Sequence, residues 1–293
     1  RVSRAYIGRC AGPADVASSG PMPATSAAYG VLGTLDLPLA LGLLRLSTEG
    51  RPAEAEAIEV VRFALEQGVR VLDTADSYAT DDRDLHYGER LVRKALAAWE
   101  GPRDQVRVIT KAGLARPKGR WVPNGRRDHL RRMVEGSLTA LGVERLFMLL
   151  LHANDPKTPL EESLAALAEL QKEGKVEHLG LCNTSIAEVR QAERHFPVRA
   201  LQNELSVVNR GSGVEGLVAL ARQMGVPFLA HRPLGGHAKV DNLLKNRAVK
   251  PIAARHGVTP HEAALAALLD LGPPVIALFG ATRRASVESS LRA

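Results

Sequence analysis

From residue 35 onward, short apolar runs alternate with longer segments in which apolar residues recur every three or four positions. The runs have the length of buried β-strands, and the longer segments have the spacing of amphipathic helices. We expect strands at 35–42, 69–73, 106–110, 146–151, 178–182, 200–205, 227–230 and 275–279. We expect helices at 53–67, 88–99, 127–141, 160–173, 186–195, 213–224 and a pair within 245–270.

Eight strands alternating with helices over about 250 residues predict a (β/α)8 TIM barrel. A doubly wound sheet would need fewer strands, and no linker rich in Pro, Gly or Ser divides residues 36–293, so we expect one barrel domain there. Residues 1–35 are rich in Ala, Gly, Ser and Pro and lack the continuous apolar segment of a secretory signal. We expect them to form a loose or partly ordered arm.

Composition narrows the function classes. No run of eighteen apolar residues occurs, which argues against a membrane span. Two distant cysteines, Cys10 and Cys182, are typical of a cytoplasmic protein without disulfides. The net charge of +7 is scattered along a chain with only 4% aromatic residues, so we expect no nucleic-acid partner. The positive charge would also suit the binding of a small ligand that carries a phosphate group.

Polar residues stand at the ends of the expected strands, where a barrel of this kind places its active site. A lysine stands directly after VRVIT and a histidine directly after LFMLLL. Burying either side chain without a polar partner would destabilise the fold. A single such residue could simply step out into a loop, but a polar residue at successive strand ends indicates a site. The residues are Asp73, Lys111, His152, Asn183, Gln202 and His231.

Asp, Lys, Tyr and His at one mouth suggest proton transfer to a carbonyl group. A nearby lysine lowers the pKa of a tyrosine hydroxyl, and a carboxylate keeps that lysine charged and in place. None of these side chains can supply a reducing equivalent, so a hydride-carrying cofactor is implied. Two tyrosines, Tyr78 and Tyr87, follow Asp73. Tyr78 is close enough to the strand end to reach Lys111 and His152, whereas Tyr87 stands at the entrance to a helix.

Seven short stretches, each at the end of its own strand, occur in an order that resembles the aldo-keto reductases. They are DTADSY (73–78), VITK (108–111), LLLHAND (149–155), GLCNTS (180–185), LQNELS (201–206), RPLGG (232–236) and FGATRRASVE (279–288). The resemblance covers roughly residues 37–293. It implies a (β/α)8 barrel that reduces an aldehyde or ketone with NADPH.

Position by position, the resemblance assigns the catalytic roles to Asp73, Tyr78, Lys111 and His152. It implies that Asn183 and Gln202 hold the nicotinamide carboxamide and that His231 stands where an aromatic ring often stacks on the nicotinamide. The pyrophosphate loop matches Leu234, Gly235 and Gly236, with Lys239 as an ion partner. The segment for the adenosine 2′-phosphate matches Gly280, Ala281, Thr282 and Arg283. An arginine there favours NADPH over NADH.

Three other interpretations compete with this one. GSGVEG (211–216) matches a dinucleotide fingerprint, but it comes late in the chain and no acidic residue closes the following strand. A metal-dependent barrel hydrolase would need converging ligands, often a His-x-His pair, which the sequence lacks, so we expect no metal. A redox-sensing partner protein of the same fold, with a cofactor but little turnover, stays open.

Two loops bear on the substrate. The acidic insertion ATDDRDLH (79–86) separates Tyr78 from the sequence YGE (87–89), and we expect it to push this helix start away from Tyr78. The loop 112–126 contains Trp121, which either lines the pocket or anchors the loop on the barrel rim. Its basic residues suggest either an anionic substrate or a solvated run of charge. These are Arg116, Lys118, Arg120 and Arg126, with Arg127 directly after the loop.

Overall fold

The computed structural model describes residues 27–208, 211–236, 243 and 245–293. Eight parallel strands close into a barrel in chain order, with the last strand paired to the first. The strands are β3 (Leu39–Gly42), β4 (Val71–Asp73), β5 (Arg107–Ala112), β8 (Leu146–Leu151), β9 (Val176–Cys182), β10 (Val198–Glu204), β11 (Phe228–His231) and β12 (Val275–Gly280). The predicted (β/α)8 barrel is therefore confirmed.

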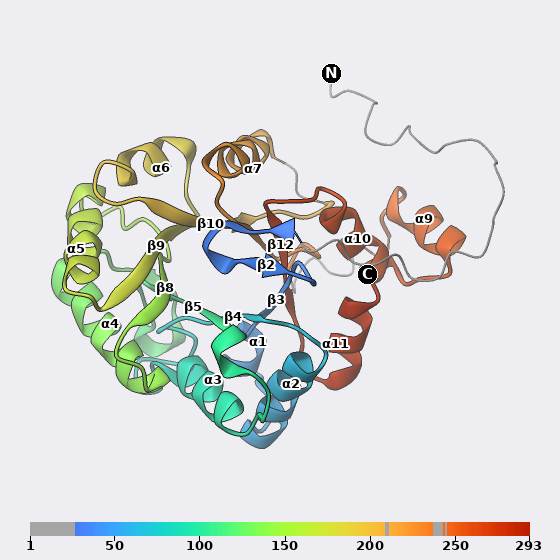
Figure 1. Ribbon diagram of the computed structural model, residues 1–293, viewed down its shortest axis with the longest axis horizontal. Helices are drawn as coiled ribbons and strands as arrows, with labels where there is room; N and C mark the ends of the chain where they lie inside the picture. Colours follow the sequence, from blue (N-terminus) through green and yellow to red (C-terminus); the bar gives the residue numbers. More distant parts are fainter. Residues whose placement is uncertain (1–26, 209–210, 237–242, 244) are drawn as a thin grey trace.

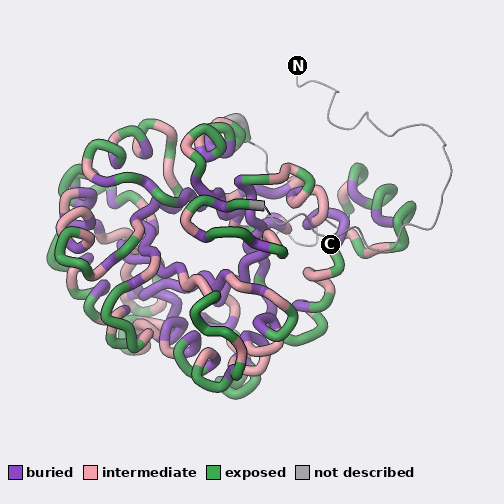
Figure 2. Tube along the Cα trace, in the orientation of Figure 1, coloured by how far each residue is buried: buried purple, intermediate pink, exposed green. Residues whose placement is uncertain are grey.

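Helices surround the barrel (Figure 1). They are α1 (Leu44–Ser47), α2 (Glu54–Glu66), α3 (Tyr87–Ala97), α4 (Arg127–Leu141), α5 (Leu160–Lys172), α6 (Ile186–Ala192), α7 (Ser212–Met224), α9 (Val249–His256), α10 (Pro260–Leu269) and α11 (Arg284–Leu291). Figure 2 shows the buried strands inside a ring of helices that are exposed on their outer sides. Helices such as α4 and α5 bury one apolar stripe against the strands, as their spacing predicts.

Continuous apolar runs form the strands because both faces of a parallel barrel strand are buried. In LFMLLL (146–151), only Phe147 is not fully buried. Met148 and Leu150 belong to the cluster inside the barrel, whereas Leu149 and Leu151 pack outward against the helices. The barrel interior is thus a packed core, and ligands can enter only at its ends.

A hairpin precedes the first barrel strand. Its strands β1 (Ala27–Ala28) and β2 (Thr34–Leu35) are antiparallel, and Tyr29 and Leu32 join the cluster inside the barrel. Gly30 lies against Gly225 and Pro227, just before β11 begins. The hairpin therefore covers the end of the barrel at which the strands start, and it crosses the barrel ring in Figure 1. The expected strand 35–42 is shorter than predicted because Leu35 belongs to this hairpin; the division into an arm and a barrel stays a prediction.

Two other elements differ from expectation. Helix α11 was not predicted, because RASVESSL contributes only Val287 as a buried residue and carries little apolar periodicity. GSGVEG (211–216) spans the first turn of the barrel helix α7, for which Gly211 is the N-cap. The preceding and following strands, β10 and β11, are neighbours in the closed barrel. The stretch is consequently a helix start in a barrel and not the first turn of a Rossmann domain.

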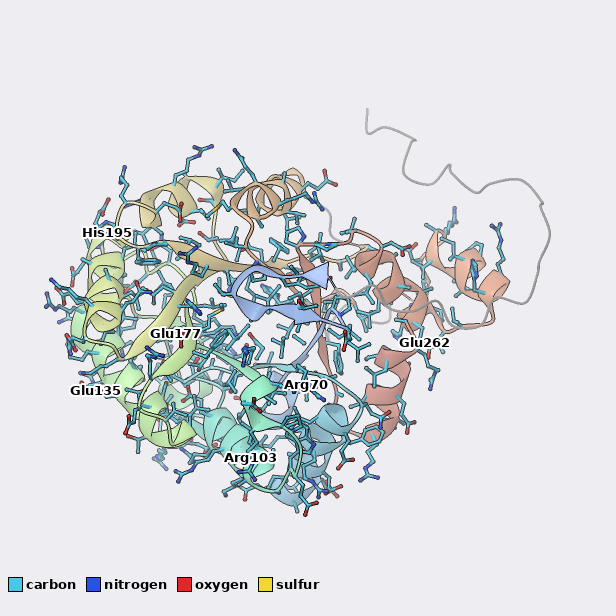
Figure 3. The ribbon with its side chains drawn as sticks, in the orientation of Figure 1. Arg70, Arg103, Glu135, Glu177, His195 and Glu262 are labelled. Carbon is cyan, nitrogen blue, oxygen red and sulfur yellow. The ribbon has the colours of Figure 1, made fainter. Side chains whose placement is uncertain are left out.

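Polar side chains gather on the outside of the helical ring, as Glu135 and His195 illustrate in Figure 3. Lys175 Nζ lies 2.8 Å from Glu135 Oε1, and both side chains are partly exposed. Such surface pairs contribute little to stability. Among the helices of the described residues, none combines the length and apolar character that a bilayer crossing requires.

Candidate active site

Lys111 is the centre of a buried cluster at the carboxyl ends of β4 and β5. Its Nζ donates to Asp73 Oδ1 at 2.6 Å, to the carbonyl oxygen of Thr74 at 2.9 Å and to Tyr78 Oη at 3.1 Å. Lys111 and Asp73 are fully buried, and Tyr78 is 7% exposed. All three protons of the ammonium are used, which compensates the cost of burying it. The structure thus brings together three of the four predicted catalytic residues.

Burial dominates the electrostatics of Tyr78. It raises the pKa of the hydroxyl to about 12, although the nearby Lys111 ammonium acts in the opposite direction. For Lys111, burial alone would lower the pKa, but the attraction of Asp73 and Tyr78 raises the net value above the ordinary one. The expectation that the lysine lowers the tyrosine pKa is therefore correct for that interaction and wrong for the net result. At neutral pH, Tyr78 keeps its proton and can donate it.

His152 completes the predicted catalytic set. It follows β8 directly, is 7% exposed, and its ring centroid lies 5.7 Å from that of Tyr78 in an edge-to-face arrangement. Burial, followed by the charge of Lys111 and the neighbouring His231, holds the pKa of His152 well below its usual value. The imidazole is therefore neutral at physiological pH. It can donate one hydrogen bond to a carbonyl oxygen that lies beside Tyr78.

Asn183, directly after β9, and Gln202, on β10, differ in their accessibility. Asn183 is exposed at a positive φ of 52°; its Nδ2 donates to the carbonyl oxygen of His152 at 3.0 Å, and its Oδ1 lies 3.0 Å from His231 Nε2. Gln202 is buried, and its Nε2 donates to Asp73 Oδ2 at 2.7 Å. Gln202 therefore holds Asp73 from the side opposite Lys111, whereas Asn183 and His231 lie at the open mouth.

The two segments predicted to bind phosphates leave neighbouring strands at the same end of the barrel. Gly235 and Gly236, with the half-buried Leu234 before them, follow β11 at positive φ values of 85° and 81°. The second segment continues from β12: Gly280 is its last residue, Ala281 is buried, and Thr282 and Arg283 are exposed. Arg283 is the N-cap of α11. Lys239, the predicted ion partner, lies outside the described residues.

The insertion 79–86 does not separate α3 from Tyr78. The amide of Gly88 donates to the carbonyl oxygen of Tyr78 at 3.0 Å, so the chain leaves Tyr78 and returns to it. Glu89 is fully buried and accepts from Thr110 Oγ1 at 2.5 Å, with His86 Nδ1 2.6 Å from its other oxygen. The expectation of a displaced helix start is wrong. The hydrogen bond between Gly88 and Tyr78 joins the two ends of the insertion, so the inserted residues do not move the helix away.

Asp76 is a buried acid beneath the same loop, and sequence reasoning assigned it no role. Neither of its carboxyl oxygens has a partner in hydrogen-bonding geometry among the described residues. Burial, and then the nearby Glu89 carboxylate, raise the pKa of Asp76 well above its usual value, against a smaller lowering by Ser77 and Lys111. Burial thus favours the protonated form of Asp76. This burial follows from the fold and could not be read from the stretch DTADSY.

Trp121 lies beside Tyr78 and His152, and its role in lining a pocket stays a prediction. Its ring centroid is 6.3 Å from that of Tyr78 and 6.5 Å from that of His152, while 45% of the residue is exposed. It also packs on the rim, against the guanidinium of Arg116. Arg116 itself is buried, so the interpretation of the loop charges as a solvated run is wrong for this residue.

One known protein family matches most of the chain. The model of the family described as "Aldo/keto reductase family" matches residues 38–293, which includes every strand of the barrel. This chain belongs to the aldo/keto reductase family. The family places it among the oxidoreductases, and the redox-neutral metal hydrolase is no longer a competing class. In the described part of the chain, no group of three or more His, Cys, Asp or Glu residues is arranged to hold a metal ion.

Curated relatives carry related names. The chain is 30% identical over 262 residues to "Uncharacterized oxidoreductase C215.11c" of Schizosaccharomyces pombe, covering 87% of this chain and 80% of the relative. It is 29% identical over 270 residues to "Probable aldo-keto reductase 1" of Glycine max, covering 82% and 75%.

Solved structures of other aldo-keto reductases have the same fold. The glycerol dehydrogenase AKR11B4 from Gluconobacter oxydans superposes with a TM-score of 0.76 at 25% identity, over 92% of this chain and 89% of that one. An aldo-keto reductase from Klebsiella pneumoniae, solved in complex with NADPH, gives a TM-score of 0.72 at 24% identity, over 92% and 90%. The second likeness shows the shared barrel and no more.

Proposed function

We propose that this aldo-keto reductase binds NADPH and reduces an aldehyde or ketone to the alcohol, with Tyr78 as the proton donor. The observation that carries the proposal is the set of three hydrogen bonds that Lys111 donates. Two of them tie the buried Asp73 carboxylate to the Tyr78 hydroxyl. A lysine used in this way contributes no hydrogen bond to a passing substrate. Instead, Lys111 places a positive charge beside the Tyr78 hydroxyl, which keeps its proton.

The residues at the mouth fit the cofactor. The turn takes positive φ values at Gly235 and Gly236, and a Cβ at Gly236 would come within 3.2 Å of Arg232 Cδ, so glycine suits both positions. Backbone amides in such turns are suited to phosphate oxygens, and the exposed Arg283 is suited to a further phosphate. Asn183 and His231 offer an amide and a neutral ring at the mouth, since burial and Arg232 lower the pKa of His231 to about 4.

A carbonyl group gains one hydride and one proton when it becomes an alcohol. NADPH supplies the hydride when it is bound, and the proton must come from the protein. Tyr78 Oη holds that proton, and His152 orients the carbonyl oxygen toward it by a hydrogen bond. The charge that develops on Tyr78 is stabilised by Lys111 at 3.1 Å, while Asp73 keeps the ammonium charged and fixed. Proton donation of this kind contributes about 10²–10⁴-fold to the rate.

Loss of NADPH absorbance with a panel of aldehydes, ketones and ketosugars tests the proposal. Glyceraldehyde belongs in the panel because a structural relative is titled a glycerol dehydrogenase. Tyr78→Phe should abolish turnover while NADPH still binds. Tyr87→Phe is the matched control: Tyr87 is also buried, but it stacks under Arg51 outside the cluster, so this variant should stay active. An active Tyr78→Phe enzyme would refute the assigned proton donor.

The competing function is a redox-sensing partner protein that binds the cofactor with little turnover. It would show NADPH binding by fluorescence and no consumption of NADPH across the whole panel, with Tyr78→Phe indistinguishable from the unmodified protein. The intact contacts among Asp73, Tyr78 and Lys111 favour the enzyme, because a binding module has no need of a buried, fully bonded ammonium beside a tyrosine.

A further inference from the structure

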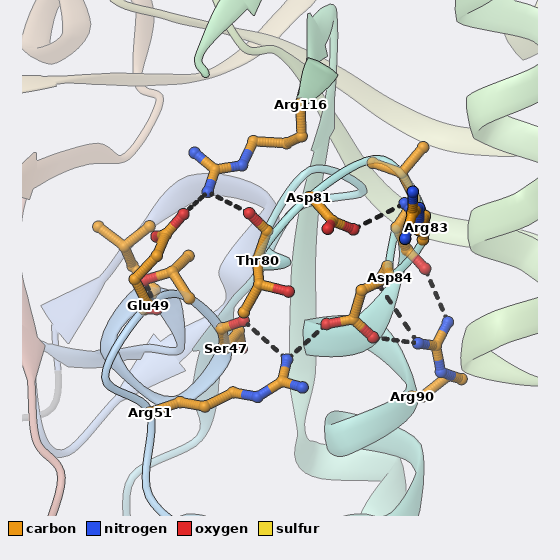
Figure 4. Close-up of polar contacts among 12 residues, drawn as sticks. Ser47, Glu49, Arg51, Thr80, Asp81, Arg83, Asp84, Arg90 and Arg116 are labelled. Carbon is orange, nitrogen blue, oxygen red and sulfur yellow. Dashed lines mark hydrogen bonds and ion pairs between the residues drawn. The ribbon is translucent and has the colours of Figure 1, made fainter. Parts of the chain in front are cut away.

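Arg116 joins three loops at the active-site end of the barrel (Figure 4). It lies in the loop between β5 and α4, and its Nη2 donates to the carbonyl oxygen of Thr80 at 3.1 Å, in the loop after β4. The same nitrogen forms an ion pair with Glu49, in the loop after β3. The side chain of Arg116 is completely buried, whereas that of Glu49 is 60% exposed. One guanidinium thus fixes the relative positions of the loops that carry Tyr78 and Trp121.

The flat face of the same guanidinium supports Trp121. Arg116 Cζ lies 3.8 Å from the centroid of the Trp121 ring, well within the range of a cation–π contact. The ring edges meet Tyr78 and His152, so Trp121 lies between the buried arginine and the two groups that face the substrate. A tryptophan with 45% of its surface exposed, in a loop, would have several orientations available without such a support.

Stability alone does not explain a buried arginine here. Nε and Nη1 of Arg116 have no hydrogen-bond partner among the described residues, and burying such donors destabilises the folded state. An apolar side chain of similar volume would avoid this cost. What only arginine provides is a planar cation that donates in its plane to two loops and stacks on an aromatic ring with its face.

We propose that Arg116 is a positioning residue that holds Trp121 as the substrate-facing wall beside Tyr78 and His152. The wall selects for carbonyl compounds that carry a flat apolar group, because such a group can pack on the exposed part of the indole ring. This inference rests on the proposed reductase function and deepens it. It assigns Arg116 no contact with substrate.

A neighbouring arginine provides the matched control. Arg51 Nη1 donates to the carbonyl oxygen of Ser47 at 3.2 Å and to Asp84 Oδ2 at 2.5 Å, so it joins the loops after β3 and β4 as Arg116 does (Figure 4). Its guanidinium stacks on Tyr87, 3.6 Å from the ring centroid, and not on Trp121. Arg51→Met therefore weakens the loop junction and leaves the support of Trp121 in place.

The first measurement needs no turnover. The sequence has two tryptophans, so in a Trp99→Phe background the emission comes from Trp121 alone. Arg116→Met should raise the acrylamide quenching constant of Trp121 about twofold and lower its fluorescence anisotropy, because the ring loses its stacking partner. Arg51→Met should change neither. Equal quenching in the parent protein and in Arg116→Met would overturn the proposal.

The second measurement compares benzaldehyde with propanal as substrates. In Arg116→Met and in Trp121→Ala, kcat/KM for benzaldehyde should fall about tenfold, mainly through KM, and propanal should lose about threefold or less. The double variant should lose no more than Trp121→Ala alone. A merely structural role would lower kcat/KM equally for both aldehydes and would refute the inference. If the unmodified protein reduces no compound of the full panel, the proposed function fails, while the quenching result still decides the role of Arg116.

Arg116→Lys covers the case in which Arg116→Met does not fold. Lysine keeps the buried charge near Glu49 but lacks the planar face, so it should reproduce the higher quenching and the selective loss of benzaldehyde turnover. Full retention of both properties by Arg116→Lys would show that charge, and not stacking, is what the position requires, and would contradict the proposal.

Discussion

The amide of Gly88 donates a 3.0 Å hydrogen bond to the carbonyl oxygen of Tyr78, across the whole insertion 79–86. A Cβ at Gly88 would lie 2.6 Å from Thr74 Oγ1, 2.9 Å from Ser47 Oγ and 3.2 Å from Tyr78 Cβ. Helix α3 can therefore approach Tyr78 this closely only because its second residue has no side chain. The position of Tyr78 depends on a residue that follows the insertion.

Gly88→Ala should displace Tyr78 from Lys111. We expect the free energy of unfolding to fall by about 1–3 kcal/mol, because the added methyl group overpacks a rigid contact, and kcat to fall with it. Urea unfolding and steady-state turnover measure the two effects. Gly213→Ala is the control: this glycine also lies in the first turn of a helix but has open space around it. That variant should be slightly more stable, by about 0.5–1 kcal/mol, with unchanged kcat.

Lys111→Met should reduce kcat by about two to four orders of magnitude, because the charge that develops on Tyr78 loses its stabilising partner. It should also destabilise the fold by about 3–5 kcal/mol, since Asp73 is then a buried carboxylate that keeps only its contact with Gln202. The double variant Asp73→Asn/Lys111→Met separates the two effects. It removes both charges, so it should recover most of the unfolding free energy without recovering kcat. A double variant with restored turnover would show that Lys111 serves the fold and not the reaction.

The pH profile of kcat follows from the pKa directions at the site. Tyr78, with a pKa of about 12, keeps its proton throughout the neutral range, and His231, with a pKa of about 4, stays neutral there. His152 is neutral as well, because its pKa lies well below the usual value. We expect kcat for reduction to be flat from about pH 6 to about pH 9. A step near the ordinary histidine pKa would contradict the buried, neutral state of His152.

Asp76 should destabilise the protein increasingly as the pH rises. In the unfolded chain it loses its proton near its ordinary pKa, whereas burial raises the pKa well above that value in the folded protein. Between the two values, deprotonation favours the unfolded state by about 1.4 kcal/mol per pH unit. Asp76→Asn cannot ionise, so its advantage in unfolding free energy over the parent protein should grow from about pH 4 upward. Urea unfolding at several pH values measures this difference.

The control for that series is Asp82→Asn, at an exposed position of the same loop. It should leave the pH dependence of the unfolding free energy unchanged. A parallel dependence in Asp76→Asn and the parent protein would show that Asp76 ionises normally in the folded state.

The sequence predicts best what depends on local pattern. A run such as LFMLLL indicates a buried strand, and a lysine after VRVIT needs polar partners at the end of its strand. The barrel and the contacts of Lys111 could therefore both be predicted from the sequence. Helix α11 was missed because it buries only Val287 and forms from its packing against α2 and α10. A local pattern cannot show such a tertiary contribution.

Contacts between loops could not be predicted from the sequence in the same way. The spacing between Tyr78 and Gly88 gives their distance along the chain, and only the fold shows that the loop closes. In the sequence, Arg116 is one of several basic residues in its loop. Its contacts with the Trp121 ring and with Glu49 are visible only in the folded structure. The net pKa of Tyr78 was misjudged for a related reason: the neighbouring charge was visible in the sequence, and the degree of burial was not.

Arg283→Ala should weaken binding of NADPH by about tenfold or more and leave NADH nearly unchanged. The loss reflects charge-assisted hydrogen bonds to a phosphate that NADH lacks, each of which contributes about 1.5–3 kcal/mol. Fluorescence titration of the two cofactors gives both dissociation constants without any substrate. Arg284→Ala is the matched control, because the adjacent Arg284 is paired with Glu59 at 2.6 Å and packs over Phe63. Equal losses for NADPH and NADH in Arg283→Ala, or a larger loss in Arg284→Ala, would remove Arg283 as the phosphate ligand.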